Sequence, residues 1–480
     1  MDAYRAPFLH RGGALTRPIP MEADKSRSAS EIVELTRWAS AAASGPLNEG
    51  LLARAARVLT DDLAAMIGAR DEPEVAAFHS RTLAQERPAE ATVFRGGRAQ
   101  TDRLSAAVAN AVAADWLELD EGYRQVPCHA GLYVLPALLA EAEFRNLPVE
   151  RMLTTLVVAY ELVTRIARAW TPKALVMQSH GRYCAIGAAA AVGLSRGLDP
   201  QTLCAAIGTA VTLTGPSPRT HLAEGVLARN VWPATGAWGG SMAVEWAQCG
   251  IAGSPVAFYD TYSTVLGGSW NPGVLITGLG ERYAIDDGYT KIYACCQHLH
   301  SAVEATLSLR GDLLSRGSLD DIASIDVESY PMAMALLNDS PQTTLGAKFS
   351  MSHAVAAALA TGTGGADAFT AATLTEQTIA RLRHQVRVAA TERTLPPPND
   401  RPARVRVRLR SGTAVEAECL SAAGGPDRPL PPSVVFEKLQ SLASPVYPQI
   451  ASVMQLLVAL DPHALKAGWS DTVARLCQTD

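Results

Sequence analysis

The sequence has no surplus of positive charge. It contains 42 Lys and Arg against 47 Asp and Glu, which gives a formal net charge of -5. A protein that binds a phosphate backbone concentrates basic residues on one surface, so this balance argues against nucleic acid as a partner. An anionic small molecule would need a local basic pocket instead.

Long apolar runs are also absent. The apolar stretch at 152–163 is interrupted by Glu161 and followed by Arg165, and the first 20 residues hold no apolar segment of secretory length. A membrane helix needs about 20 consecutive apolar residues. We therefore expect neither a membrane span nor a signal peptide.

The eight cysteines follow no regular spacing. Disulfide frameworks are typical of short secreted domains, whereas scattered cysteines in a long chain are typical of free thiols in a reducing compartment. We expect a cytoplasmic protein.

Several catalytic motifs are missing as well. The sequence contains no P-loop, no GxGxxG after a predicted strand, no GxSxG and no HExxH. Nucleotide-dependent enzymes and serine hydrolases therefore lose their usual support. We therefore expect any catalytic residues to be isolated polar residues within apolar, helical sequence.

The composition that is present favours a large core. Of 480 residues, 48% are hydrophobic, and the length favours two domains. Apolar residues recur at helical spacing from Leu52 to Met66 and from Met152 to Val163, which predicts amphipathic helices. We predict a mostly α fold with four parts: a flexible arm at 1–28, an all-helical domain at 29–310, a smaller α+β lid domain at 311–430, and C-terminal helices at 431–480 that return to the helical domain.

The α+β prediction rests on a change of pattern after residue 310. The pattern predicts two strands, SIDVESYPM and RHQVRVAATE, with the helix MSHAVAAALATG between them. In ARVRVRLRSGTAVEAECL, arginines alternate with Val and Leu, so one face is buried and the arginine face is solvated. A three-residue loop at 411–413 would pair Arg408 with Glu416 across a hairpin.

One group of polar residues lies at a helix junction, in LELDEGYRQVPCHAGLYVLP. Glu118, Asp120 and Glu121 end an Ala-rich helix, and His129 precedes the next helix. Capping and solvent exposure explain any one of these carboxylates. His129 is more informative, because Gly131 allows close backbone approach and the following helix offers free N–H groups.

Two further polar residues begin predicted helices. His180, in SHGRYCAIG, starts a helix poor in bulky side chains, so it either caps the helix or lines a pocket. Arg229, in LARNVWPATGAWGG, opens a Gly-rich helix, where it either clamps a carboxylate through two N–H groups or forms an internal salt bridge.

The segment 291–300, KIYACCQHLH, combines one cation, two thiols and two imidazoles. Its thiols and imidazoles suggest zinc, but the sequence has no second ligand cluster at zinc-ribbon spacing, so we expect no metal. Helical geometry from Cys295 onward would place Cys296 and His300 on one face. Lys291 would bind an anionic group or lower the pKa of the thiol.

Taken in order, these segments resemble the MmgE/PrpD family, whose members include dehydratases, decarboxylases and an epimerase of small polycarboxylates. The resemblance runs from about residue 30 to about residue 445. The family's acidic run and His-Pro-Gly segment are similar to LELDEGYR and HAGLYVLPALLAEAE in this chain. Its His-Gly helix is similar to SHGRYCAIGAAAAVGL. Many members have a Lys-containing segment at the place of ARNVWPATGAWGG, and a Lys and an aromatic before a downstream His at the place of KIYACCQHLHSAVEA. Their Lys-Phe-Ser segment lies at the place of GAKFSMSHAV, which contains Lys348.

The chain departs from the family pattern at four positions. Many members have Asp and Thr where this chain has Glu118 and Gly122, Lys at the position of Arg229, and His at that of Cys296. The residues that keep the family type are His129, Asp120, Lys291 and His300.

The resemblance implies an active site between the helical domain and the lid, no organic cofactor, and a homodimer formed through the helical domain. The family's chemistry moves a proton, or releases carbon dioxide, next to a carboxylate. The charge that develops needs cations in a dry site and one base near the working pH. The implied catalytic residues are His129, Asp120, Lys291 and Cys296, and the implied substrate-binding residues are Arg229, His180, Lys348, His300 and Glu118.

The sequence therefore favours a lyase that acts next to a carboxylate of a small polycarboxylic acid, by dehydration or decarboxylation. Three alternatives stay open. The first is an epimerase in which His129 and Cys296 handle protons on two faces of one carbon. The second is an inactive relative that binds a carboxylate ligand, and the third is a zinc-dependent enzyme built on the Cys-His segment.

Overall fold

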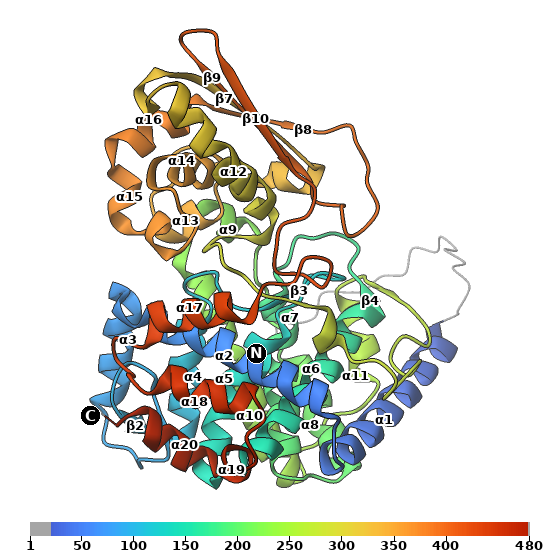
Figure 1. The fold of residues 1–480 in the computed structure, drawn as a ribbon. Coiled ribbons are helices and arrows are strands. Elements are labelled where there is room, and N and C mark those ends of the chain that lie inside the picture. The colour runs from blue at the N-terminus through green and yellow to red at the C-terminus, as the bar shows by residue number, and fades with distance from the viewer. Residues whose placement is uncertain (1–20, 479–480) are drawn as a thin grey trace, which may run out of the picture.

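The computed structural model describes residues 21–478. Figure 1 shows a larger body, lower in the view, built almost entirely of helices, and a smaller body above it in which helices pack against a four-stranded sheet. Helices dominate both bodies, so the prediction of a mostly α fold is confirmed. That the smaller body acts as a lid stays a prediction.

The larger body contains most of the helices formed by residues 21–259. They are α1 (Met21–Ser44), α2 (Glu49–Gly68), α3 (Pro73–Leu83), α4 (Arg103–Ala114), α5 (Ala130–Arg145), α6 (Val149–Ala169), α7 (Ser179–Ser195), α8 (Pro200–Thr212), α10 (Trp232–Gln248) and α11 (Ala257–Tyr259). Four C-terminal helices pack on α2, α5 and α6. They are α17 (Pro432–Ala443), α18 (Ile450–Val458), α19 (Pro462–Lys466) and α20 (Trp469–Leu476).

The first helix begins earlier than the sequence suggested. A flexible arm was predicted over 1–28, but residues 21–28 belong to α1. Ala29, Ile32 and Leu35 recur at helical spacing and are buried, so an apolar stripe fixes this helix to the body. Residues 1–20 lie outside the described residues.

Close packing of small residues joins the central helices α5, α7 and α10. A Cβ atom added at Gly240 in α10 would lie 2.3 Å from the carbonyl oxygen of Ala185 in α7. One added at Gly187 in α7 would lie 2.7 Å from Cβ of Tyr133 in α5. Larger side chains would force these helices apart, so the Ala- and Gly-rich stretches set the short distances between them.

The smaller body is built on a mixed sheet with the strand order β10-β9-β7-β8. Strands β7 and β8 are parallel, and the other neighbours are antiparallel. Its elements are α9 (Thr220–Glu224), α12 (His300–Arg316), β7 (Ile322–Ser329), α13 (Thr344–Lys348), α14 (Met351–Thr361), α15 (Ala371–Thr375), α16 (Gln377–Gln385), β8 (Val386–Ala390), β9 (Ala403–Leu409) and β10 (Ala414–Cys419). Because α12 packs on β9 and β10, this body begins before the boundary predicted at residue 310.

Strands β9 and β10 form the expected hairpin, but in a different register. Backbone pairing closes a three-residue loop at 410–412, where Gly412 has a φ of 90°, in the left-handed region that suits glycine. As a result Arg406, and not Arg408, faces Glu416. A shift of two residues keeps every side chain on the same face, so the alternating pattern did not distinguish the two registers.

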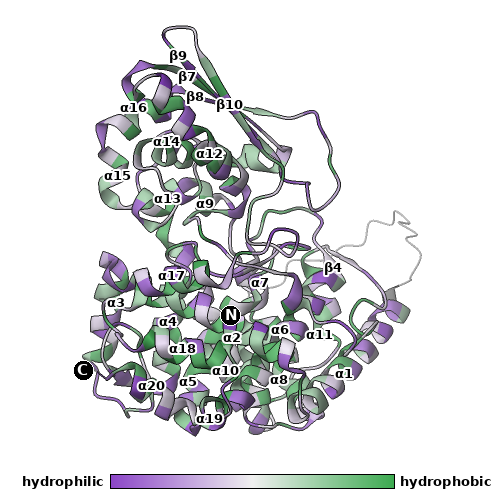
Figure 2. Cartoon of the chain, in the orientation of Figure 1, coloured by the Kyte–Doolittle hydropathy of each residue, from purple (hydrophilic) through white to green (hydrophobic). Residues whose placement is uncertain are grey.

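The apolar core lies mainly inside the larger body. In Figure 2 the hydrophobic ribbon is concentrated in the interior helices, including α2 and α10, while hydrophilic residues mark outer helices such as α1. Within residues 21–478, the helices are too short or too polar for any of them to cross a membrane.

Short strand pairs fix loops of the larger body against one another. β3 (Gly122–Tyr123) pairs with β6 (Gly288–Tyr289), which brings the acidic run beside the segment that begins at Lys291. The other pairs are β1 (Ala91–Thr92) with β2 (Gln100–Thr101), and β4 (Trp170–Thr171) with β5 (Ser269–Trp270).

Candidate active site

A pocket of about 260 Å³ lies where the two bodies meet. The larger body contributes the loop before α5, the residues before α7 and the segment before α10, and the smaller body contributes Met332, Phe349 and Arg401. The sequence-predicted residues that line this pocket are His129, Glu118, Arg229, Lys291 and Cys296. Asp120, His180, Lys348 and His300 lie outside its lining.

His129 directly precedes α5 and lines the pocket, with 19% of its side chain exposed. Nδ1 lies 2.6 Å from Oδ2 of Asp120 and 3.1 Å from the carbonyl oxygen of Glu121. Both neighbours are acceptors, so Nδ1 carries the proton and donates it. Nε2 then keeps its lone pair, and no hydrogen-bond partner among residues 21–478 occupies it. In this tautomer the ring can take a proton from a bound molecule.

Asp120 joins His129 to Lys291. Oδ1 of Asp120 lies 3.3 Å from Nζ of Lys291, and each side chain is 1% exposed. Burial alone would raise the pKa of Asp120, but the positive charge of Lys291 and the hydrogen bond from His129 outweigh it and hold that pKa well below its usual range. Burial likewise lowers the pKa of Lys291, but the charge of Asp120 outweighs it, so the pKa of Lys291 is raised. Carboxylate and ammonium are therefore both charged at neutral pH.

Glu118 is the second carboxylate beside Lys291. Its Oε2 lies 3.5 Å from Nζ of Lys291. Its backbone φ is 54°, in the left-handed region, which costs a residue with a side chain about 1–2 kcal/mol. The unusual backbone turns the acidic run so that Glu118 and Asp120 approach the same ammonium group.

Arg229 is fully buried and bridges two carboxylates. Its guanidinium pairs with Oδ2 of Asp115 and with Oε1 of Glu118, and it donates to the Asp115 carbonyl at 3.2 Å and to Asn230 at 3.1 Å. The sequence left a ligand clamp and an internal salt bridge open, and the structure shows the salt bridge. Burial lowers the pKa of Arg229, but the charges of Asp115 and Glu118 outweigh it and raise that pKa.

His180 lies behind His129 rather than in the pocket. Its Nε2 is 3.3 Å from Oδ2 of Asp115, and its Nδ1 is 3.1 Å from the hydroxyl of Tyr133. The rings of His180 and His129 are nearly perpendicular, with centroids 5.1 Å apart. Burial lowers the pKa of His180, so the ring is neutral at neutral pH and supports His129 by packing.

The Cys-His segment divides between the pocket and the protein interior. Cys296 and His298 line the pocket, whereas His300 hydrogen-bonds through Nδ1 to the hydroxyl of Tyr289 and through Nε2 to the carbonyl of Cys295 at 3.0 Å. A short 3-10 helix separates Cys296 from α12, which begins at His300. The expectation that Cys296 and His300 share one helical face is therefore wrong.

The thiol of Cys296 is protonated at neutral pH. Burial and the charge of Glu118 raise its pKa. The charge of Lys291 lowers that pKa, as the sequence allowed, but burial and Glu118 outweigh it. In the part of the chain that the structure describes, no three His, Cys, Asp or Glu side chains gather in an arrangement that could hold a metal ion. The zinc interpretation of this segment therefore loses its support.

Lys348 lies at the end of α13 and is buried. Its Nζ donates to the carbonyl oxygen of Trp116 at 2.8 Å, and burial lowers its pKa. The ammonium is thus engaged with the backbone rather than with the pocket.

Two residues of this region escaped the sequence analysis. Asp115 precedes Glu118 by three residues. This spacing places both carboxylates near one helix end and could have indicated that Asp115 belongs to the same acidic cluster. Arg219 lines the pocket from the Pro- and Gly-rich loop GPSPRTH, where periodicity carries no information.

The arrangement combines a base and a fixed cation in one small pocket. The lone pair on Nε2 of His129 can accept a proton, and the ammonium of Lys291 can stabilise negative charge on a neighbouring carboxylate. Because the surrounding carboxylates and cations are buried, their interactions with a bound anion would be weakly screened.

Two family profiles match the chain. The MmgE/PrpD N-terminal domain matches residues 33–266, and the MmgE/PrpD C-terminal domain matches residues 293–461. A cis-aconitate decarboxylase from Aspergillus terreus is 27% identical over 334 residues, which are 64% of this chain and 66% of that protein. A cis-aconitate decarboxylase-like protein, oryM, from Aspergillus oryzae is 23% identical over 451 residues, which are 88% of this chain and 92% of that protein. The match to the Aspergillus terreus protein thus spans slightly less than two thirds of its length.

Proposed function

The chain belongs to the MmgE/PrpD family, and on this premise we propose that it is a cofactor-independent lyase acting next to a carboxylate of a small polycarboxylic acid, by dehydration or decarboxylation. The observation that carries the proposal is the Asp120–His129 pair, which leaves Nε2 of His129 free toward the pocket that Lys291 also lines. The names of the cis-aconitate decarboxylase relatives support the same class of reaction.

His129 is the proton-transfer group. In a dehydration, Nε2 takes the proton from the carbon next to the carboxylate, the freed electron pair forms the double bond, and hydroxide leaves the neighbouring carbon. The imidazolium returns the proton to that hydroxide, so water departs and the ring is restored. In a decarboxylation, Nε2 first takes a proton from solvent water; the electron pair of the broken C–C bond stays on the substrate carbon as carbon dioxide leaves, and the imidazolium delivers its proton to that carbon, which restores the neutral ring.

Lys291 is the group that binds the carboxylate next to the reacting carbon. An ammonium has three N–H donors, and those of Lys291 face Asp120 at 3.3 Å and Glu118 at 3.5 Å. One donor is left for a substrate oxygen in the pocket. Negative charge that builds up on the substrate carboxylate would then meet a cation already in place, which needs no reorganisation during the reaction.

Arg229 acts on the site through its carboxylate partners. Its N–H groups already bind Asp115 and Glu118, so it shares one positive charge between two buried acids and holds Glu118 beside Lys291. This role suits arginine, whose planar guanidinium can bridge two carboxylates.

An epimerase is the second candidate, because Cys296 lines the same pocket as His129. His129 would take a proton from one face of the carbon, and the protonated thiol of Cys296 would deliver another to the opposite face. The raised pKa of Cys296 makes the thiol a donor, while the reverse reaction would need a thiolate that burial disfavours.

Proton NMR in deuterated water tests the proposal. The purified protein is incubated with hydroxylated, unsaturated and amino-substituted di- and tricarboxylates, and both exchange and products are followed. A new alkene or a lost carboxylate supports the lyase. Exchange without a new carbon skeleton supports the epimerase, and no change across the panel argues for a carboxylate-binding relative without activity.

A further inference from the structure

We propose that Arg219 binds a second carboxylate of the substrate in the outer part of the pocket, away from the carbon that reacts beside His129. The inference rests on the proposed function, because it names a feature of the same substrate. That substrate carries at least two carboxylates, and one of them is remote from the reacting carbon.

Arg219 lines the pocket and is only partly buried, whereas Lys291 is 1% exposed. The loop that carries it is held in place, since the backbone N–H of Arg219 donates to the carbonyl oxygen of Val176 at 3.0 Å. The positive charges of Arg219 and Lys291 both act on the thiol of Cys296, against the larger effect of burial. Arg219 and Lys291 are therefore both close enough to the Cys296 thiol, in the pocket wall, to interact with it electrostatically.

The other basic residues that line the pocket already pair with carboxylates. Arg229 and Lys291 do so as described above, and Arg124 and Arg401 both contact Asp400, at 3.0 Å and 3.5 Å. Arg219 is different, because no carboxylate among residues 21–478 pairs with it. A guanidinium presents five N–H donors and is suited to bidentate carboxylate binding, so this unpaired cation is the group that an incoming carboxylate would meet.

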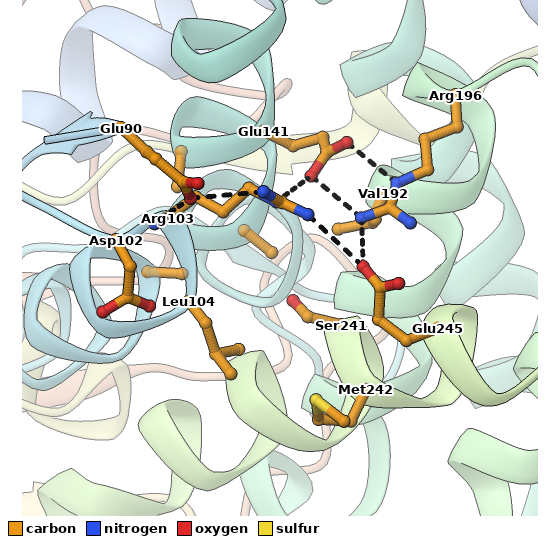
Figure 3. Close-up of a pocket in the computed structure, with 13 residues that line it drawn as sticks. Glu90, Asp102, Arg103, Leu104, Glu141, Val192, Arg196, Ser241, Met242 and Glu245 are labelled. Atoms are coloured by element: carbon orange, nitrogen blue, oxygen red, sulfur yellow. Dashed lines mark hydrogen bonds and ion pairs between the residues drawn. The ribbon is translucent and has the colours of Figure 1, made fainter. Parts of the chain in front are cut away.

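A second pocket, of about 220 Å³ among α4, α5, α7 and α10, provides a contrast. Figure 3 shows that its two arginines are bridged by glutamates of the protein itself. Arg103 lies 3.2 Å from Glu141, and Arg196 lies 2.7 Å from Glu245. Unlike Arg219, both arginines of this pocket have carboxylate partners within the protein, which is typical of a structural ion-pair cluster.

His298 positions the guanidinium of Arg219. Nη2 of Arg219 lies 3.5 Å from Nε2 of His298, and Nδ1 of His298 hydrogen-bonds with the hydroxyl of Tyr330. Burial and the charge of Arg401 lower the pKa of His298 well below its usual value, so the ring is neutral. Because an arginine only donates, Nε2 accepts from Arg219, and Nδ1 carries the hydrogen that is donated to Tyr330.

The test compares a substrate that the wild type turns over with an analogue whose remote carboxylate is replaced by a primary amide. We expect Arg219→Gln to raise KM for the carboxylate substrate about 10- to 100-fold, the range for losing a charged hydrogen bond, with little change in kcat. KM for the amide analogue should be the same in the variant and the wild type. Arg219→Lys should restore part of the affinity, and Arg37→Gln, at an exposed arginine of α1, should behave as wild type.

Two results would overturn the inference. One is an unchanged KM in Arg219→Gln, and the other is an equal rise in KM for the carboxylate substrate and the amide analogue. The positioning role of His298 has its own readout: His298→Leu should raise KM for the carboxylate substrate alone, and His298→Gln, which keeps an acceptor, should restore it.

The inference stays testable if the proposed function fails. Should the wild type turn over none of the panel, titration calorimetry with propane-1,2,3-tricarboxylate measures binding directly. We expect binding to the wild type and an affinity about 10-fold lower for Arg219→Gln. Equal affinities, or no binding to the wild type, would refute the role of Arg219 independently of any activity.

Discussion

Nδ1 of His129 lies 2.6 Å from Oδ2 of Asp120, and this contact decides which ring nitrogen faces the pocket. Since the carboxylate accepts, the hydrogen stays on Nδ1 and the lone pair stays on Nε2. Asp120 remains an anion because Lys291 holds its other oxygen. The proton-accepting state of His129 therefore depends on a buried cation 171 residues away from Asp120 in the sequence.

Asp120→Asn should abolish the proposed lyase activity while leaving the substrate bound. The amide N–H₂ would donate to Nδ1 and favour the tautomer with the hydrogen on Nε2, which cannot take a proton. We expect kcat to fall about 100-fold or more, as for loss of a general base, with a smaller change in KM. Initial rates by NMR measure this, with the exposed Asp312→Asn as control. A kcat close to that of the wild type would show that Asp120 does not set the tautomer.

Arg229→Met should destabilise the protein strongly. It leaves Asp115 and Glu118 buried without their shared counter-charge, and breaking a buried ion pair from one side typically costs about 3–5 kcal/mol. Urea unfolding followed by circular dichroism measures the loss. Arg316→Met removes a half-exposed pair with Asp312 at 2.8 Å and should change little. Equal stabilities of the two variants would contradict the bridging role.

Cys296→Ser distinguishes the lyase from the epimerase. In the lyase, the thiol is part of the pocket wall, so we expect kcat to stay within about threefold of the wild type. In the epimerase, serine is a much weaker acid than the thiol, so formation of the other epimer would be lost, while proton exchange on the face of His129 would continue. Exchange and product formation are followed in the same NMR experiment, and Cys249→Ser, at an exposed cysteine, is the control.

Glu121→Gln should change how stability depends on pH. Burial raises the pKa of Glu121 from 4.5 to about 8, and its Oε1 accepts from the Tyr160 hydroxyl at 2.7 Å. Because the folded protein holds this proton more tightly than the unfolded chain, its stabilising effect is complete below about pH 4.5 and is lost as the pH rises through about 8.

The wild type should therefore lose more thermal stability between pH 6 and pH 9 than Glu121→Gln, which keeps a neutral side chain throughout. Glu34→Gln, at an exposed position of α1, should follow the wild type. Identical pH profiles for Glu121→Gln and the wild type would mean that Glu121 is ionised in the folded protein at neutral pH.

Local patterns were enough to predict much of the fold. Apolar spacing from Leu52 to Met66 predicted a helix that lies within α2, and the switch to alternation after residue 310 predicted strands that became β7, β8, β9 and β10. The hairpin register was wrong because registers that differ by two residues bury the same side chains.

The candidate site was only partly predictable, because its geometry depends on contacts between distant segments. The two-residue pairing of β3 with β6 brings Lys291 beside the acidic run, and such a short pairing leaves no mark in the sequence. The sequence allowed Arg229 either to clamp a ligand carboxylate or to form an internal salt bridge. The salt bridge forms because the fold places Asp115 next to Arg229. Arg219 sits in a loop, where neither periodicity nor capping preferences indicate which way a side chain points.

The most direct test of the proposed chemistry is the initial rate of wild type and His129→Gln on the same polycarboxylate, followed by proton NMR in deuterated water. Glutamine preserves much of the volume and can still hydrogen-bond, but it cannot take up a proton at neutral pH. We predict that the variant folds as the wild type does and forms product at least about 100-fold more slowly. A folded variant that turns over substrate at the wild-type rate would contradict the assignment of His129 as the proton-transfer group.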